Sequence, residues 1–189
     1  MMQSDEAVRR FLEGDHEAFE ILVRQWETRI YNLAWRFLGN REDAQDVVQE
    51  TFLSVFRSVR KLREPKSFST WLYRIALNHC RGRWRMQNPD FSLNDQLPRG
   101  DGDDKEVSGI DVIGRYDRDA LETVDLIRKA LTGLSEDHRS AIILKEYVGL
   151  SLEEVAAVMG CPLSTAKSRL YHGLRSVQRN LKRIGVKTS

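Results

Sequence analysis

The spacing of apolar residues along the chain is helical wherever it is regular. Between residues 19 and 37, apolar side chains recur every three or four positions, the period of one face of an α-helix. These residues are Phe19, Leu22, Trp26, Ile30, Leu33 and Phe37. Gly39 and Asn40 predict the end of this helix, because both residue types tolerate the left-handed backbone that often closes a helix. No useful stretch alternates apolar and polar residues as a strand would, so the pattern predicts an all-α fold.

Two further helices are predicted in the first half of the chain. One covers about 42–62, and a proline-containing loop separates it from another over about 70–86. Gly82 lies inside the last of these helices, where glycine costs about 1 kcal/mol relative to alanine. We therefore expect that helix to end early and to leave Arg83 and Arg85 in a loop.

The second half divides into a linker and another helical region. Residues 88–119 contain two prolines, four glycines and little periodicity, which is typical of a flexible linker. Helical spacing resumes over 120–134, and Ser135 begins a helix that runs to Gly149. The sequence thus predicts two small helical bundles, 1–87 and 120–189, joined by the linker.

Charge is distributed unevenly although the net charge is only +2. Residues 66–89 carry five Lys or Arg and no acid, and residues 160–189 carry seven and no acid. Residues 90–119 carry nine acids against four bases. Two basic blocks indicate two surfaces for a polyanion. The acidic linker is either a solvated spacer or a cover for these surfaces, and the sequence leaves both readings open.

Residues 151–175 have the pattern of a helix-turn-helix. Ser151 and Glu154 have the spacing of a capping box, Gly160 permits a tight turn, and Pro162 suits the start of the next helix. A recognition helix of this kind places polar and basic side chains in the major groove of DNA. The candidate DNA-binding residues here are Ser164, Thr165, Lys167, Ser168, Arg169, Tyr171, His172 and Arg175. The alternative is an ordinary solvated basic helix.

A second candidate surface lies on the predicted helix 70–86. Trp71, Arg74, Asn78, Arg81 and Arg85 are three or four residues apart and therefore share a face. Aromatic rings stack on unpaired bases and arginines meet phosphates, so this stripe suits single-stranded nucleic acid. Core packing is an equally good interpretation of the tryptophan alone, and we expect the histidine at position 79 to be structural.

Three runs of sequence resemble a known family. The runs DAQDVVQETFLSVFRSV (43–59) and SFSTWLYRIALNHCRGRWR (67–85) resemble region two of the extracytoplasmic-function (ECF) sigma factors of bacterial RNA polymerase. The run LSEDHRSAIILKEYVGLSLEEVAAVMGCPLSTAKSRLYHGLRSV (134–177) is similar to their region four. This resemblance implies that 1–87 is a region-two domain, 88–119 a linker, and 120–189 a region-four domain.

The resemblance also implies partners and residue roles. The segment expected to dock on the clamp helices of the largest core polymerase subunit contains Asp46, Gln49, Glu50 and Phe52. The segment expected to read and melt the minus-ten element contains Lys66, Ser67, Phe68, Ser69, Thr70, Trp71, Arg74, Asn78 and Arg81, and its first five residues form a loop that captures a base. Residues 163–175 would read the minus-thirty-five element, and the apolar surface of region four would pack on the flap of the second-largest subunit. An anti-sigma protein usually holds such factors inactive.

Other functional classes fit the sequence less well. A response-regulator-type helix-turn-helix regulator would need a receiver or sensing domain upstream, whereas residues 1–87 are helical and end in a basic aromatic stripe. An enzyme would need clustered carboxylates or an activated nucleophile, and the only dense acids, Asp101 to Asp104, lie in the linker. Cys80 and Cys161 match no paired metal spacing, so we predict no metal, no cofactor and no disulfide. Without an apolar leader or span, we expect a cytoplasmic protein.

Overall fold

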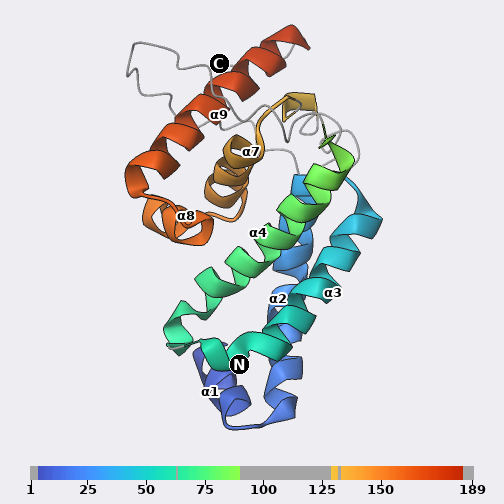
Figure 1. The fold of residues 1–189 in the computed structure, drawn as a ribbon, viewed down its shortest axis with the longest axis vertical. Coiled ribbons are helices and arrows are strands. Elements are labelled where there is room, and N and C mark those ends of the chain that lie inside the picture. Colours follow the sequence, from blue (N-terminus) through green and yellow to red (C-terminus); the bar gives the residue numbers. More distant parts are fainter. Residues whose placement is uncertain (1–3, 63, 90–128, 132, 185–189) are drawn as a thin grey trace. The chain divides into compact units, whose positions relative to one another are not determined.

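The computed structural model describes residues 4–62, 64–89, 129–131 and 133–184. All regular elements within these residues are helical, which confirms the all-α prediction (Figure 1). The chain divides into two compact units, Met1–Arg83 and Trp84–Ser189. In the described part, no helix is long and apolar enough to cross a membrane. Nearly all of the predicted linker, and most of the helical pattern expected over 120–134, lie outside the described residues.

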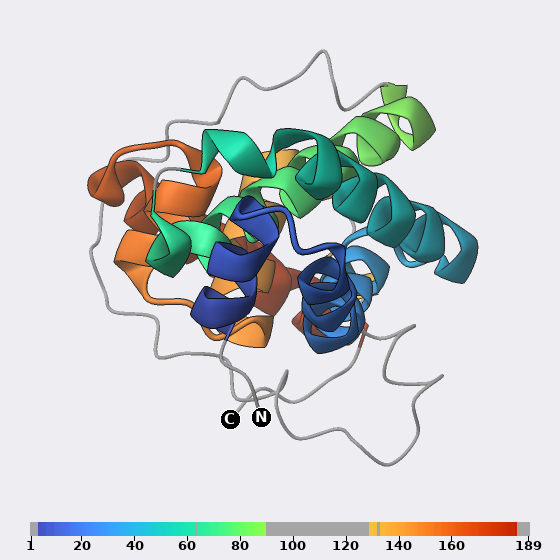
Figure 2. The same ribbon diagram turned by 90° about the horizontal axis from the view of Figure 1, so that it is seen from below.

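The first unit begins with a helical hairpin, of which the sequence predicted only the second helix. Helix α1 (Ser4–Leu12) precedes α2 (His16–Leu38), and Figure 2 shows α1 beside the first turns of α2. Only nine residues form α1, too few for its apolar period to stand out. Helix α2 ends as predicted: Gly39 adopts the left-handed conformation with φ 73°, and its N–H donates to the carbonyl of Trp35.

Helix α3 (Arg41–Ser58) follows at once and lies antiparallel to α2 (Figure 1). Asn40 caps its start, because the side-chain oxygen accepts a hydrogen bond of 2.8 Å from the Glu42 N–H. A 3₁₀ turn (Val59–Lys61) continues the helix to the predicted end near residue 62.

Helix α4 (Phe68–Gln87) corrects two expectations about its ends. It starts directly after a 3₁₀ turn (Pro65–Ser67), two residues earlier than predicted, because burial of Phe68 draws that residue into the first turn. It also runs through Gly82, so the expected early end was wrong. The cost of about 1 kcal/mol for the glycine is offset by the contacts of Arg83 with three carboxylates of α3.

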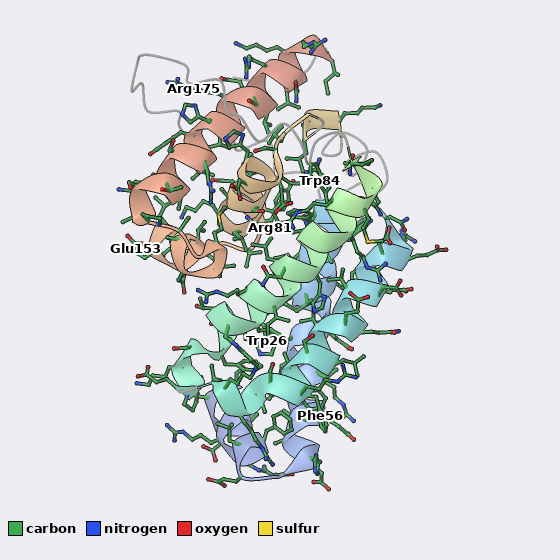
Figure 3. All side chains as sticks on the ribbon, in the orientation of Figure 1. Trp26, Phe56, Arg81, Trp84, Glu153 and Arg175 are labelled. Carbon is green, nitrogen blue, oxygen red and sulfur yellow. The ribbon has the colours of Figure 1, made fainter. Side chains whose placement is uncertain are left out.

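The core of the first unit is formed by the apolar faces of these helices. Trp26 of α2 lies at its centre, with ring centroids 6.0 Å from Phe68 and 5.7 Å from Tyr73 of α4 (Figure 3). The largest fully buried side chains around it are Leu22, Ile30, Leu33, Phe37, Phe68, Leu72 and Leu77. These contacts fix α4 on α2 and so determine which face of α4 is exposed.

The second unit contains a three-helix arrangement. Helix α7 (Glu136–Ile142) continues as a π-helical segment (Ile143–Tyr147), and α8 (Leu152–Met159) and α9 (Leu163–Arg183) follow. Ser135 caps α7 as predicted, since its hydroxyl accepts a hydrogen bond from the N–H of the third helical residue. Helix α9 packs on both α7 and α8 through its buried face.

A glycine permits the close contact of α9 with α7. A Cβ added at Gly173 would lie 2.8 Å from Ile142 Cδ1, 3.2 Å from His138 Cβ and 3.3 Å from the His138 carbonyl oxygen. An added Cβ would therefore displace the end of the Ile142 side chain and crowd His138, so glycine favours this close approach of the helices.

Candidate nucleic-acid interface

The helix-turn-helix of the second unit has the geometry that its sequence predicts. The Ser151 hydroxyl accepts a hydrogen bond of 3.1 Å from the Glu154 N–H, and the Ser151 N–H donates one of 2.8 Å to the Glu154 carboxylate. Both halves of the capping box are thus present. Gly160 closes α8 with φ 66°, and the buried side chains of Val155 and Ala166 pack α8 against α9.

One face of α9 presents most of the candidate DNA-binding residues to solvent. Its other face is buried and consists of Ala166, Leu170, Gly173, Leu174, Val177 and Leu181. The exposed candidates are Ser164, Lys167, Ser168, Tyr171 and His172, and the partly exposed ones are Thr165, Arg169 and Arg175. Figure 3 labels Arg175 on the outer side of α9. This face offers hydroxyl, cationic and aromatic groups, which is the set that base edges and phosphates bind.

Arg169 on this face has a partner on another helix. Its Nη2 forms an ion pair with Oδ2 of Asp137 on α7. The two side chains are only 26% and 23% exposed. Asp137 lies in the first turn of α7, where an acid is favourable at any helix N-terminus.

The predicted stripe on α4 is also accessible. Arg74 and Asn78 are exposed, and Trp71 and Arg81 are partly exposed, whereas Leu72, Ala76, Leu77 and Cys80 on the other side are buried. Trp71 is thus partly accessible and also contacts the core at Phe68, with 6.1 Å between ring centroids. An aromatic ring, an amide and two guanidinium groups lie along one helical face.

The segment Lys66 to Thr70 does not form the loop that we expected. Lys66 and Ser67 are exposed in the 3₁₀ turn, but Phe68, Ser69 and Thr70 belong to the first turn of α4. Phe68 is only 1% exposed. Its ring therefore stabilises the core below the surface and is not available to a nucleic acid.

The docking residues predicted on α3 also include both accessible and buried side chains. Asp46 and Gln49 are exposed and Glu50 is partly exposed. Phe52 is 7% exposed and packs edge-on against Phe19, 6.3 Å between ring centroids. The phenylalanine is a core residue of this unit, so three of the four candidate docking side chains remain accessible.

A cluster of α3 and α4 side chains holds these carboxylates in place. Arg83 Nη1 lies 2.9 Å from Asp43 Oδ1 and 3.0 Å from Asp46 Oδ2, and its Nη2 lies 2.8 Å from Glu50 Oε1. Its hydrogen bond with Glu50, with smaller contributions from both aspartates, raises the pKa of Arg83 above its ordinary value. The guanidinium thus remains charged and fixes the acidic face.

His79 joins the same cluster from α4. Its Nδ1 lies 3.2 Å from Glu50 Oε2, and its Nε2 lies 3.0 Å from the Ser54 hydroxyl. The side chain bridges α4 to α3, which agrees with the structural role predicted for it.

The remaining chemistry of the described residues is sparse. Within 4–62, 64–89, 129–131 and 133–184, no three His, Cys, Asp or Glu side chains gather closely enough to hold a metal ion. Both cysteines are free thiols, and burial raises the pKa of the Cys80 thiol far above its ordinary value.

Comparison with known proteins identifies the family. The model for sigma-70 region 2 matches residues 22–89, and that for sigma-70 region 4 matches residues 125–177. The RNA polymerase sigma-H factor of Pseudomonas aeruginosa is 34% identical over 186 residues, which is 95% of this chain and 94% of the relative. The ECF RNA polymerase sigma factor SigW of Bacillus subtilis is 30% identical over 193 residues, 96% and 98% of the two chains. The chain belongs to the ECF sigma factors.

Two solved structures share the fold of this ECF sigma factor. One is CnrH in complex with the cytosolic domain of CnrY, with a TM-score of 0.71 at 23% identity over 95% of this chain and 97% of that chain. The other is the sigma factor RpoE of Bartonella quintana in complex with the anti-sigma factor NepR, with a TM-score of 0.61 at 23% identity over 87% and 96%.

The two family matches cover the helices that carry the candidate surfaces of this ECF sigma factor. The region 2 match spans α2 to α4, and the region 4 match includes α7, α8 and the first part of α9. Sequence reasoning found the exposed stripes but missed Asp137, Arg83 and Gly173, because each acts through a contact with a distant part of the chain. Because we expected the helix to end near Gly82, we placed Arg83 in a loop and did not predict its contacts with α3.

Proposed function

We propose that this ECF sigma factor is a dissociable initiation subunit that recruits core RNA polymerase, places it on two promoter elements and stabilises the opened strand. The observation that carries this proposal is the presence of two different nucleic-acid surfaces in one chain. One is a helix-turn-helix, and the other is a helical stripe with a partly exposed tryptophan, an amide and arginines. A protein that only recognises duplex DNA needs the first surface but not the second.

In region four, α9 would enter the major groove at the minus-thirty-five element. Lys167 and Arg169 are suited to guanine edges or phosphates, and the hydroxyls of Ser164 and Ser168 can bind either. The exposed face of α9 and the buried opposite face support this orientation.

In region two, the α4 stripe would hold unpaired bases of the minus-ten element. Trp71 supplies a ring on which a base can stack, and Asn78 supplies an amide that can donate and accept hydrogen bonds. Lys66 and Ser67, at the turn before α4, are the accessible part of the segment that we expect to border an extruded base.

The acidic face of α3 would dock on the clamp helices of the largest polymerase subunit. Asp46, Gln49 and Glu50 present oxygens to a basic partner, and Arg83 fixes two of the carboxylates before binding. Preorganised groups lose less entropy on association, which supports this face as the docking site. The apolar surface of region four would contact the flap of the second-largest subunit.

An anti-sigma protein would keep this factor inactive until a signal arrives. The support is that both solved structures of similar fold hold a partner, the cytosolic domain of CnrY in one and the anti-sigma factor NepR in the other. We further propose that the protein has no catalytic activity of its own and works in the cytoplasm, where polymerase and promoter DNA are found.

A reconstituted transcription assay tests this function. The full chain is added to purified core polymerase, promoters are selected from fragmented genomic DNA of the source organism, and run-off transcripts are measured. We expect transcripts that depend on the added chain and start downstream of two shared sequence elements at fixed spacing. Binding to the fragments without any transcript would instead support a helix-turn-helix regulator.

A further inference from the structure

The cations of α9 that face DNA in the proposed complex are not equivalent. Lys167 is exposed, whereas Arg169 is about three-quarters covered and is tied to Asp137. An aspartate beside a DNA-binding surface repels phosphate, so a carboxylate at this position weakens general affinity for DNA. Its presence beside Arg169 therefore needs another function.

The aspartate itself is rigidly placed. It is the second residue of α7, directly after the turn that Ser135 caps. Helix α7 in turn contacts α9 closely at Gly173, where an added Cβ would lie 2.8 Å from Ile142 Cδ1 and 3.2 Å from His138 Cβ. A carboxylate on this support has little freedom to move relative to the recognition helix, so it can define the position of a partner side chain.

We propose, on the basis of the proposed promoter function, that Asp137 is a positioning residue that orients Arg169 to read a base edge of the minus-thirty-five element. The guanidinium has five N–H donors in a fixed plane. Asp137 engages Nη2, which leaves the other edge of the guanidinium to donate to the O6 and N7 acceptors of a guanine. A flexible arginine would instead reach several phosphates, and it would lose more side-chain entropy when it bound one base.

This proposal predicts opposite effects on two measured quantities. Without Asp137, the discrimination between the selected promoter and one with a changed guanine should fall. Affinity for unrelated DNA should stay the same or rise, because a negative charge is lost near the phosphates. A carboxylate that only masked Arg169 would, when removed, raise affinity and leave or increase discrimination. A carboxylate that only stabilised the domain would alter neither quantity in the folded variant.

The test uses the reconstituted holoenzyme with the full chain and a set of promoters that differ at single positions of the minus-thirty-five element. We expect D137N and R169A each to lower discrimination at the same base pair by about fivefold or more, the lower end for one bidentate contact. The double variant D137N/R169A should lose no more than R169A alone, because both changes remove one contact. D137E should restore part of the discrimination.

A matched control is E153Q, which removes one negative charge from the exposed first turn of α8. It should leave discrimination at that base pair unchanged. Unchanged discrimination in folded D137N, or in R169A, would overturn the proposal. Increased discrimination in D137N would do so as well and would indicate masking. In each of these cases, promoter-dependent transcription by the unmodified chain would leave the proposed function standing.

Discussion

Two glycines lie inside helices in the described part of this ECF sigma factor, and their surroundings are opposite. At Gly82 of α4, an added Cβ would meet nothing within 4 Å. At Gly173 of α9, it would meet Ile142 Cδ1 at 2.8 Å and atoms of His138 at 3.2 and 3.3 Å. Substitution of Gly82 therefore measures the intrinsic cost of a glycine in a helix. Substitution of Gly173 also measures the effect of crowding between two helices.

We expect Gly173→Ala to destabilise the protein and Gly82→Ala to stabilise it. Alanine gains up to about 1 kcal/mol over glycine in a helix interior, which the exposed Gly82 position should realise almost fully. At Gly173, overpacking of about 1–3 kcal/mol opposes this gain, so the net loss should be roughly 1 kcal/mol. Urea unfolding followed by circular dichroism measures both variants. A Gly173→Ala protein as stable as the Gly82→Ala protein would refute the close crossing of α7 and α9.

At the residue scale, the sequence predicted which side chains are exposed better than it predicted which residues they contact. The polar stripe of α4 and the exposed polar face of α9 follow from helical periodicity alone. Phe52 and Phe68 lie within the correct segments, but both rings are buried in the core and so are not accessible site residues. The partner of Arg169 lies 32 positions away in the chain, and no local pattern specifies such a contact.

The turn between α1 and α2 shows how one carboxylate stabilises an element. Asp15 caps α2, accepting hydrogen bonds of 3.0 Å from the Glu17 N–H and 3.4 Å from the Ala18 N–H. It also accepts one of 2.8 Å from Arg10 Nε of α1. The Arg10 hydrogen bond is the main cause that lowers the pKa of Asp15 below its ordinary value of 3.8, and the backbone donors add to it.

This lowered pKa predicts a pH-dependent contribution to stability. The carboxylate form is favoured by folding, so its contribution is fully present above the unfolded pKa of about 3.9. It is lost as the pH falls below that value and through the lower folded pKa. Asp15→Asn keeps a good capping residue without the charge. We expect the wild type to be more stable at pH 6, and the difference to shrink as the pH falls below the unfolded pKa and to vanish only below the lower folded pKa. A pH-independent difference in urea unfolding would contradict this role.

At the element scale, helix ends with side-chain chemistry were predictable, and ends set by packing were not. Gly39, Ser135 and the Ser151–Glu154 pair mark ends that the structure confirms. The start of α4 depends on the burial of Phe68, and its continuation past Gly82 depends on ion pairs with α3. Helix α1 is short and gains its order from packing on α2.

For the molecule as a whole, the distribution of charge along the chain predicts separate surfaces with separate partners. The basic blocks fall on the α4 stripe and on α9, and the acids of α3 form their own face. The structure adds that Arg83 neutralises part of this acidic face from within. That cluster joins residues 33 to 40 positions apart, so it could not be read from local spacing.

Docking on polymerase is tested best by substitutions that leave the Arg83 cluster largely intact. We expect the double variant Asp46→Lys and Gln49→Lys to weaken binding to core polymerase about tenfold or more, because like charges across an interface repel. Asp43 and Glu50 still hold Arg83 in this variant. Glu27→Lys, an exposed reversal on α2, is the control and should bind normally. Normal binding by the folded double variant would place the docking surface elsewhere.

The melting role of α4 is the central claim, and one comparison tests it directly: open-complex formation by an Asn78→Ala holoenzyme on duplex and on pre-melted bubble promoters. If the stripe holds unpaired bases, its binding energy is gained only after the duplex opens. The variant should then form closed complexes normally and open the duplex roughly tenfold more slowly, the scale of one lost base contact. The bubble template should restore most of the activity. Lys167→Ala, on the recognition helix, should be impaired similarly on both templates. Equal impairment of Asn78→Ala on duplex and bubble would contradict the melting role.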